Sequence, residues 1–160
     1  IPIMWKTGHS FIKSKMKEIS SPLAGEMSGH IFFADRYLGY DDGIYAALRV
    51  LELIRDRYTL DNFLDSLPKT FSTQEIKIEC SDDKKFMIIK ELARTLDSEK
   101  VKVNKVDGLR VQKDDGWWLL RASNTQAVLV ARVEAKSKSS LNNLQKELNL
   151  YLDKFNLSLS

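Results

Sequence analysis

Residues 101–134, VKVNKVDGLRVQKDDGWWLLRASNTQAVLVARVE, contain a succession of short apolar segments separated by turn residues. Asp107-Gly108 and Asp115-Gly116 are typical of tight hairpin turns. The pattern predicts strands over 101–106, 109–112, 117–121 and 127–134. Because consecutive hairpins pair with one another, these strands should form an antiparallel sheet.

Helical patterns lie on both sides of this region. Residues 76–79 alternate as a half-buried strand does, and Ser81 or Asp82 can then cap a helix with the apolar positions Phe86, Ile89, Leu92, Ala93 and Leu96. After the sheet, apolar residues recur at steps of three and four: Leu141, Leu144, Leu148, Tyr151, Leu152 and Phe155. Together these elements predict an α+β domain in which two helices back one face of an antiparallel sheet.

The first part of the chain mixes the two kinds of element. We expect a strand at Ile1–Trp5, a short helix from Phe11 to about Glu18 capped by Ser10, a loop over 20–29, a strand over 30–34, and a helix after Asp41-Asp42-Gly43. This part of the chain therefore mixes strands and helices. Pro68 and the hydroxyl residues after it suggest a boundary between domains at 1–70 and 71–160.

Composition excludes several classes of protein. The chain has 160 residues, with 25 Lys and Arg against 22 Asp and Glu, so a net charge of +3 does not indicate wholesale binding to a nucleic-acid backbone. One cysteine and two histidines allow no internal disulfide and no structural zinc site of the usual Cys/His kind, and we expect no metal ligands here. The single cysteine fits a reducing, cytoplasmic setting. Apolar runs fall short of the about 20 residues that span a bilayer, so we expect no membrane anchor. The chain starts without Met, and we expect it to be a piece of a longer protein.

Residues 25–30, GEMSGH, could read vicinal hydroxyls of a sugar. The glycines allow close approach of the backbone, and Glu26, Ser28 and His30 supply an acceptor, a hydroxyl and an adjustable imidazole. The alternative is a polar surface turn that leads into the next strand.

A second polar segment, Arg121-Ala122-Ser123-Asn124-Thr125, connects two strong strands. A guanidinium, two hydroxyls, an amide and exposed backbone N–H groups suit the oxygens of one phosphate. The alternative is an ordinary turn, which has the same composition. Lys6 and His9 precede the short helix, whose N-terminus favours an anion; the alternative is a plain helix start with a surface lysine.

The sequence shows no nucleophile paired with a base, no metal cluster and no carboxylate pair, so by itself the chain resembles a ligand-binding protein rather than an enzyme. A noncatalytic module that binds phosphosugars or nucleic acid is therefore an open alternative to an enzyme.

Four segments in register resemble the α-D-phosphohexomutase family, and specifically bacterial phosphomannomutase/phosphoglucomutase. They are MWKTGHS at 4–10, GEMSGHIFF at 25–33, YDDGIY at 40–45 and RASNT at 121–125. Related phosphoglucosamine mutases usually have Gln in place of Met27 and Ser-Gly-Thr in place of Ser123-Asn124-Thr125. The resemblance implies the C-terminal part of domain 3 over 1–70, which is a partial α/β domain with a mixed sheet and helices. It also implies domain 4 over 71–160, with an α+β fold like that of the TATA-box-binding protein.

The resemblance also implies the roles of individual residues. Glu26 and Ser28 would bind adjacent ring hydroxyls, with His30 in the same loop, and Lys6 and His9 would lie near the substrate. The phosphate would be gripped by Arg121, Ser123, Asn124 and Thr125.

The parent enzyme would interconvert hexose 1- and 6-phosphates of mannose or glucose through a phosphoserine and a bisphosphorylated sugar. The resemblance implies Mg²⁺ and an activator such as glucose 1,6-bisphosphate. The phosphoserine and the Mg²⁺ loop would lie in N-terminal domains of the same protein, so this piece alone should be inactive. Its partners would be those domains and a phosphorylated hexose, with neither nucleic acid nor membrane. One departure stands out: Gln126-Ala127 replaces the usual Thr-Pro or Glu-Pro, so the rigidity that proline gives is lost there.

Overall fold

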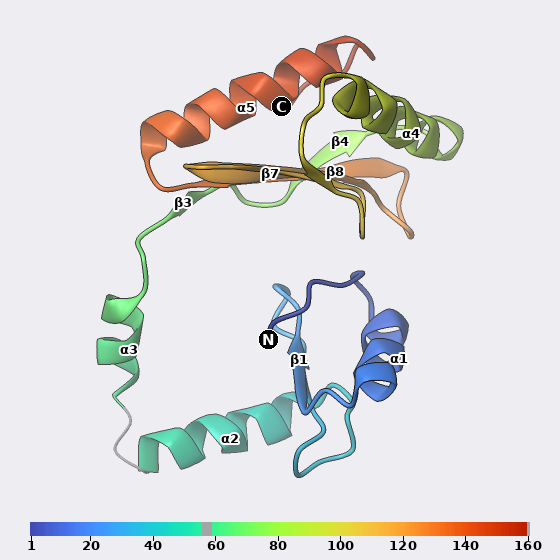
Figure 1. The fold of residues 1–160 in the computed structure, drawn as a ribbon. Helices are drawn as coiled ribbons and strands as arrows, with labels where there is room; N and C mark the ends of the chain where they lie inside the picture. The colour runs from blue at the N-terminus through green and yellow to red at the C-terminus, as the bar shows by residue number, and fades with distance from the viewer. Residues whose placement is uncertain (56–58, 160) are drawn as a thin grey trace. The chain divides into compact units, whose positions relative to one another are not determined.

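The computed structural model describes residues 1–55 and 59–159 and divides the chain into two compact units, Ile1–Pro68 and Lys69–Ser160 (Figure 1). We call them unit 1 and unit 2 and describe each by itself. Both contain helices and strands, as the sequence predicts for an α/β part followed by an α+β part.

Unit 1 contains the helices α1 (His9–Ile19), α2 (Gly43–Arg55) and α3 (Leu60–Ser66) and the strands β1 (Leu23–Gly25) and β2 (Ile31–Phe33). The strands pair antiparallel, with Ala24 opposite Phe32. Phe32 is fully buried and packs with Ile12 and Met16 of α1, which lie one turn apart on the helix. This small core fixes α1 against the β1–β2 hairpin.

Three local predictions for unit 1 are wrong. Residues 1–5 form no strand, and Ile1, Ile3 and Met4 are exposed, because the sheet of the described unit consists of β1 and β2 paired with each other. The expected loop over 20–29 contains β1, which is a strand because its backbone pairs with β2. Ser10 lies inside α1, and Gly8 takes the N-cap position with a φ of 123°, which a side chain would strain.

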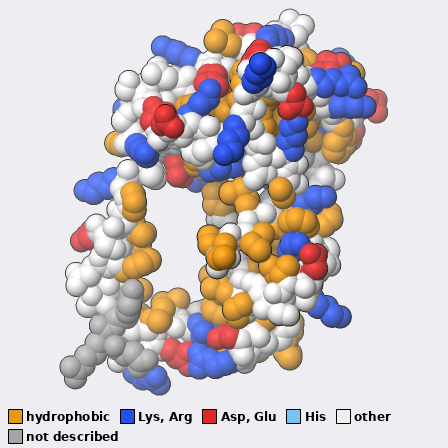
Figure 2. Space-filling view, viewed as in Figure 1, with side chains coloured by type: hydrophobic (Ala, Val, Ile, Leu, Met, Phe, Trp, Pro, Cys, Tyr) orange, Lys and Arg blue, Asp and Glu red, His pale blue; other side chains and the backbone are white. Residues whose placement is uncertain are grey.

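Helix α2 forms where the sequence predicts it. Its start is fixed by Asp42, whose Oδ1 accepts a hydrogen bond of 2.9 Å from the Tyr45 N–H. Its apolar residues are not buried by the described part of the chain: Ile44 is 79% exposed and Leu51 is 58% exposed. Figure 2 shows apolar side chains at the surface over α2 and α3.

Unit 2 is built on an antiparallel sheet. Its strands are β3 (Phe71–Ser72), β4 (Ile76–Glu79), β5 (Val103–Asn104), β6 (Leu109–Lys113), β7 (Gly116–Ala122) and β8 (Val128–Ala135). The order is β3-β8-β7-β6-β5, and β4 also pairs with β8. Helices α4 (Asp82–Ser98) and α5 (Lys138–Asp153) cover the same face of the sheet (Figure 1). The prediction of an antiparallel sheet backed by two helices is confirmed.

The core of unit 2 lies between the sheet and these helices. Trp118 is fully buried, whereas its neighbour Trp117 points to the other face and stacks with Arg110 at 4.5 Å. Helix α5 contributes Leu144, Leu148 and Leu152, as its periodicity predicts. The prediction is wrong for Phe86, which is 55% exposed, because α4 turns Lys85 and Ile88 toward the sheet in line with the predicted Leu92 and Leu96.

The single cysteine, Cys80, is buried in this core, and burial raises the pKa of its thiol. Of the helices in residues 1–55 and 59–159, none has the length and apolar character needed to cross a membrane.

Candidate functional site

The GEMSGH segment forms the loop of the β1–β2 hairpin. The Glu26 N–H donates to the carbonyl of His30 at 2.9 Å, and the Gly29 N–H donates to the carbonyl of Glu26 at 3.0 Å. Gly29 has a φ of 90°, which glycine adopts without steric cost. The turn therefore brings Glu26 and His30 to opposite ends of one tight loop, with Ser28 exposed at its tip.

Glu26 is held by the start of α1. Its Oε1 accepts a hydrogen bond of 2.7 Å from the Gly8 N–H, one of the amides that a helix N-terminus leaves without an intrahelical partner. Its side chain is only 9% exposed, and Oε2 lies 4.0 Å from Nε2 of His9. The positive end of the helix dipole thus fixes the carboxylate in a single orientation.

His30 is oriented by a carboxylate that the sequence analysis assigned only to a helix start. Its Nδ1 lies 2.8 Å from Oδ2 of Asp41, whose Oδ1 accepts from the Ile31 N–H at 3.2 Å. The hydrogen bond from His30 holds the pKa of the Asp41 carboxyl below its usual value, so Asp41 is ionised at neutral pH. With Nδ1 occupied, the other ring nitrogen of His30 is the one available to a ligand.

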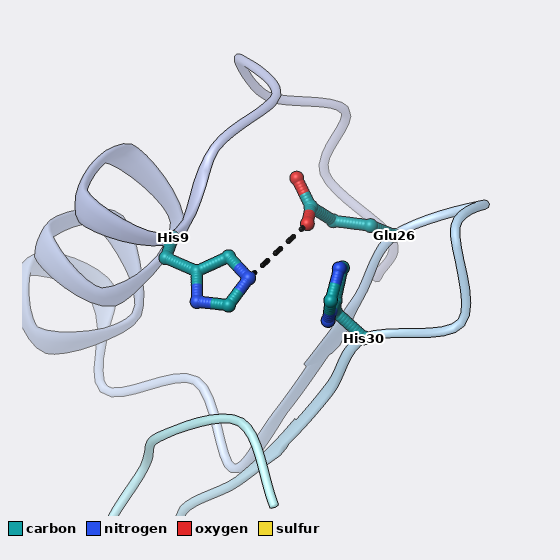
Figure 3. Close-up of side chains that lie close together, drawn as sticks. All are labelled: His9, Glu26 and His30. Carbon is teal, nitrogen blue, oxygen red and sulfur yellow. Dashed lines mark ion pairs between the residues drawn. The ribbon is translucent and has the colours of Figure 1, made fainter. Parts of the chain in front are cut away.

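His9 completes a cluster with these residues (Figure 3). The rings of His9 and His30 meet edge to face with centroids 4.6 Å apart, and His9 also contacts Phe32 of the core at 5.3 Å. Figure 3 shows that His9 comes from α1 and the other two side chains from the hairpin. Lys6, the remaining candidate of unit 1, is exposed, and its ammonium lies 5.7 Å from the ring of Phe11.

In unit 2, the candidate phosphate loop connects β7 to β8. Arg121 is the penultimate residue of β7 and lies opposite Val130, on the sheet face away from the helices. The Ser123 N–H donates to the carbonyl of Val128 at 3.1 Å, which closes the base of the loop. Asn124 and Thr125 are exposed beyond it.

Ser123 organises this loop from within. It is 7% exposed, and its Oγ accepts hydrogen bonds from the backbone N–H groups of Gln126 at 3.1 Å and Thr125 at 3.3 Å. A hydroxyl has two acceptor sites and one donor. Both acceptor sites of the Ser123 hydroxyl are therefore used inside the loop, and its O–H can donate a hydrogen bond to an anion.

Lys85 is a residue of this region that the sequence analysis did not single out. It is 3% exposed, and its Nζ donates to the carbonyl of Gln126 at 2.9 Å and pairs with Asp82 at 2.6 Å. The neighbouring carbonyl of Ala127 accepts from the Cys80 N–H at 3.0 Å. These bonds fasten the end of the loop where Gln126-Ala127 stands. The signal in the sequence was a lysine in phase with the apolar stripe of α4.

Two further arginines lie on the same sheet face as Arg121. By register, Arg110 and Arg132 flank Leu119 on either side. Nε of Arg132 is buried and makes no hydrogen bond within the described residues. The sheet face next to the candidate phosphate loop thus carries positive charge that the sequence analysis did not assign to the site.

In unit 1 the side chains of His9, Glu26 and His30 lie together, and in unit 2 the β7–β8 loop is ordered around the Ser123 hydroxyl. Two family models match the chain: "Phosphoglucomutase/phosphomannomutase, alpha/beta/alpha domain III" over residues 1–71, and "Phosphoglucomutase/phosphomannomutase, C-terminal domain" over residues 75–150. The chain belongs to the phosphoglucomutase/phosphomannomutase family.

Relatives support this membership. The phosphomannomutase/phosphoglucomutase of Pseudomonas aeruginosa is 47% identical over 145 residues, which are 90% of this chain and 31% of that protein. The phosphoglucomutase of Neisseria gonorrhoeae is 42% identical over 94% of this chain and 33% of its own length. A crystal structure of a phosphoglucomutase/phosphomannomutase family protein from Burkholderia thailandensis aligns with a TM-score of 0.85 and 40% identity, covering 96% of this chain and 32% of that chain. The chain thus spans about a third of the length of the relatives it matches.

Proposed function

We propose that the chain supplies the sugar-binding and phosphate-binding loops of a phosphohexomutase that interconverts hexose 1- and 6-phosphates of mannose or glucose. In this proposal Glu26 and Ser28 bind two adjacent ring hydroxyls, with His30 beside them and with Lys6 and His9 near the substrate. Arg121, Ser123, Asn124 and Thr125 bind the phosphate. The observation that supports it most is that both loops are already ordered by internal hydrogen bonds that leave ligand-facing groups unused: the Ser123 proton in one loop and a ring nitrogen of His30 in the other.

The geometry suits a substrate that must bind in two orientations. A mutase has to accept the sugar with its phosphate at C1 and at C6, so the ring turns over between the two half-reactions. Equatorial hydroxyls at C3 and C4 take nearly equivalent places in both poses. Glu26 accepts from such hydroxyls in either pose, because an ionised carboxylate has several acceptor sites. Catalysis of this kind depends mainly on positioning and charge stabilisation, which are the contributions these loops make.

The chemical steps belong to parts of the proposed enzyme outside this chain. We propose that the phosphoserine that exchanges phosphate with a bisphosphorylated sugar lies in its N-terminal domains, so that this chain alone is inactive, and that glucose 1,6-bisphosphate or a similar compound acts as activator. The one group of three candidate metal ligands among the described residues has two imidazoles and one carboxylate. Mg²⁺ prefers oxygen ligands, so these residues do not fit it, and the proposed enzyme would hold Mg²⁺ elsewhere.

The alternative of a noncatalytic module is not favoured by any of the comparisons. For a nucleic-acid binder we expect a continuous basic stripe. Figure 2 shows Lys and Arg side chains interspersed with Asp and Glu on the face in view.

Two substitutions in the proposed full-length enzyme test the roles. Glu26→Ala and Arg121→Ala should each lower turnover with glucose 1-phosphate by about a hundredfold, because each removes a group aimed at the substrate in a preorganised site. Arg94→Ala on the exposed side of α4 removes the same charge away from the loops and should leave turnover unchanged. If both loop variants kept the activity of the native enzyme, the assignment of roles would be wrong.

A further inference from the structure

We propose that His9, Glu26 and His30 bind a divalent transition-metal ion such as Zn²⁺. One potential ligand atom from each residue lies within 4.8 Å of the others. The three come from different segments, the start of α1 and the two ends of the hairpin loop, and they face a common space (Figure 3). In a tetrahedral zinc site with ordinary bond lengths the ligand atoms lie about 3.3 Å apart. Modest side-chain rotation closes the cluster to that size, since the side chain of His9 is 45% exposed and has room to turn.

The cluster has the outer contacts that orient metal ligands. Histidines that bind metals usually use one ring nitrogen for the metal and the other for a carboxylate or carbonyl. Nδ1 of His30 already contacts Asp41 at 2.8 Å, which directs Nε2 to the metal. Oε1 of Glu26 is held by the Gly8 N–H at 2.7 Å, which leaves Oε2 near His9. The ring of His9 rests against buried Phe32, which limits its motion on the core side.

The ligand types select the class of metal. Two imidazoles and one carboxylate form the ligand set of many zinc sites with an open fourth position, whereas Mg²⁺ and Ca²⁺ prefer sets of oxygen atoms. Imidazole also suits other late transition metals, so Co²⁺ is a usable spectroscopic substitute for Zn²⁺. The sequence predicts no metal ligands when only cysteines and histidines are counted. The fold brings Glu26 close to the two histidines, which the sequence does not indicate.

A consequence of this site rests on the proposed function. Glu26 and His30 are also the proposed readers of the sugar hydroxyls, so a bound metal ion occupies the same groups. Zn²⁺ and the hexose phosphate should then compete, and Zn²⁺ would act as an inhibitor.

Titration of the chain with Co²⁺, followed by visible absorption, tests the metal site. We expect one Co²⁺ per chain, displaced by Zn²⁺, with no sulfur-to-metal charge-transfer band, because the single cysteine is buried in unit 2. Glu26→Gln, His9→Ala and His30→Ala should each raise the Kd at least about tenfold, and Asp41→Asn about tenfold through loss of the outer contact. Glu75→Gln, which removes a carboxylate from unit 2, should leave the Kd unchanged.

Glu26→Gln is the variant least able to disturb the fold, because its amide oxygen still accepts from the Gly8 N–H. Absence of Co²⁺ and Zn²⁺ binding by the native chain, or binding that survives in both Glu26→Gln and His30→Ala, overturns the metal site. If glucose 1-phosphate binds at both loops while no metal binds, the metal site fails and the proposed function stands. If Zn²⁺ binds but does not weaken binding of glucose 1-phosphate, the inhibition is wrong.

Discussion

Substitution of Ser123 by alanine tests how much this hydroxyl contributes to the stability of the candidate phosphate loop and to anion binding. The change removes the acceptor of the hydrogen bonds from Gln126 at 3.1 Å and Thr125 at 3.3 Å. Each such neutral bond contributes about 0.5–1.5 kcal/mol, and the longer bond is the weaker one. Because Thr125 and Gln126 are exposed, water partly replaces the lost acceptor. We therefore expect the free energy of unfolding of unit 2 to fall by about 1 kcal/mol.

The effect on anion binding should be larger than the effect on stability. Ser123→Ala removes the hydroxyl proton that we assign to the phosphate, and a hydrogen bond to a charged group is worth about 1.5–3 kcal/mol. Since 1.4 kcal/mol corresponds to a factor of about ten, the Kd for glucose 1-phosphate should rise at least about tenfold. Loosening of the loop adds to this loss, because the backbone amide of Asn124 and the side chains of Asn124 and Thr125 are then less well placed.

Two measurements on the same variant test this reasoning. Urea unfolding followed by tryptophan fluorescence in a chain with Trp5→Phe and Trp117→Phe, which keeps only buried Trp118, gives the stability of unit 2. Amide NMR titration with glucose 1-phosphate gives the Kd at Asn124 and Thr125. Ser81→Ala is the matched control: Ser81 is exposed at the start of α4 and makes no side-chain cap hydrogen bond. That control should change the free energy of unfolding by less than about 0.5 kcal/mol. A Ser123→Ala chain with the native urea midpoint and native Kd would refute the role of this hydroxyl.

Three other predictions concern the frame that carries the loops. Leu148→Ala, at a fully buried position of α5, should lower the free energy of unfolding by about 3 kcal/mol through lost burial and a cavity, measured by urea unfolding; a loss below about 1 kcal/mol would contradict the packing described. Gly116→Ala places a Cβ 2.3 Å from a backbone carbonyl of β8 and should cost about 1–3 kcal/mol in thermal unfolding, whereas Gly43→Ala, with nothing within 4 Å, should be nearly neutral; equal effects would show that the strands are not this close. The hydrogen bond from Arg49 lowers the pKa of Asp35 from 3.8 to about 2, so the stability that this ion pair contributes is present above pH 3.8 and is lost as the pH falls toward 2. In Asp35→Asn, the stability of unit 1 should therefore fall less between pH 3.8 and 2 than in the native chain, and an unchanged acid profile would exclude the ion pair as the cause.

Much of unit 2 could be predicted because its signals are local. Alternation in a strand indicates that Trp117 and Trp118 point to opposite faces but not which of them is buried, and steps of three and four residues placed Leu144, Leu148 and Leu152 of α5 in the core. Unit 1 was harder to predict, since a strand requires a partner. Residues 1–5 have strand composition but form no strand in the described unit, whereas Leu23–Gly25 has loop composition and pairs with β2.

The contacts that organise the candidate site could not be predicted from the sequence. Residues of both loops were selected by their chemistry and by the resemblance of their motifs to a known family, but the pairing of His30 with Asp41 depends on how the chain returns past β2. The bond from Lys85 to Gln126 joins residues 41 positions apart. Such contacts are set by tertiary packing, and no periodicity in the sequence records them.

The central claim is that the GEMSGH loop binds sugar hydroxyls and that the loop from Ser123 to Thr125 binds phosphate, and amide NMR titration of the chain with glucose 1-phosphate tests both parts most directly. The account predicts that glucose 1-phosphate shifts the amides of Glu26, Ser28 and His30 and those of Ser123 to Thr125, whereas inorganic phosphate shifts only the second group. A GEMSGH loop that does not respond to glucose 1-phosphate, or a loop from Ser123 to Thr125 that responds to neither compound, would contradict it.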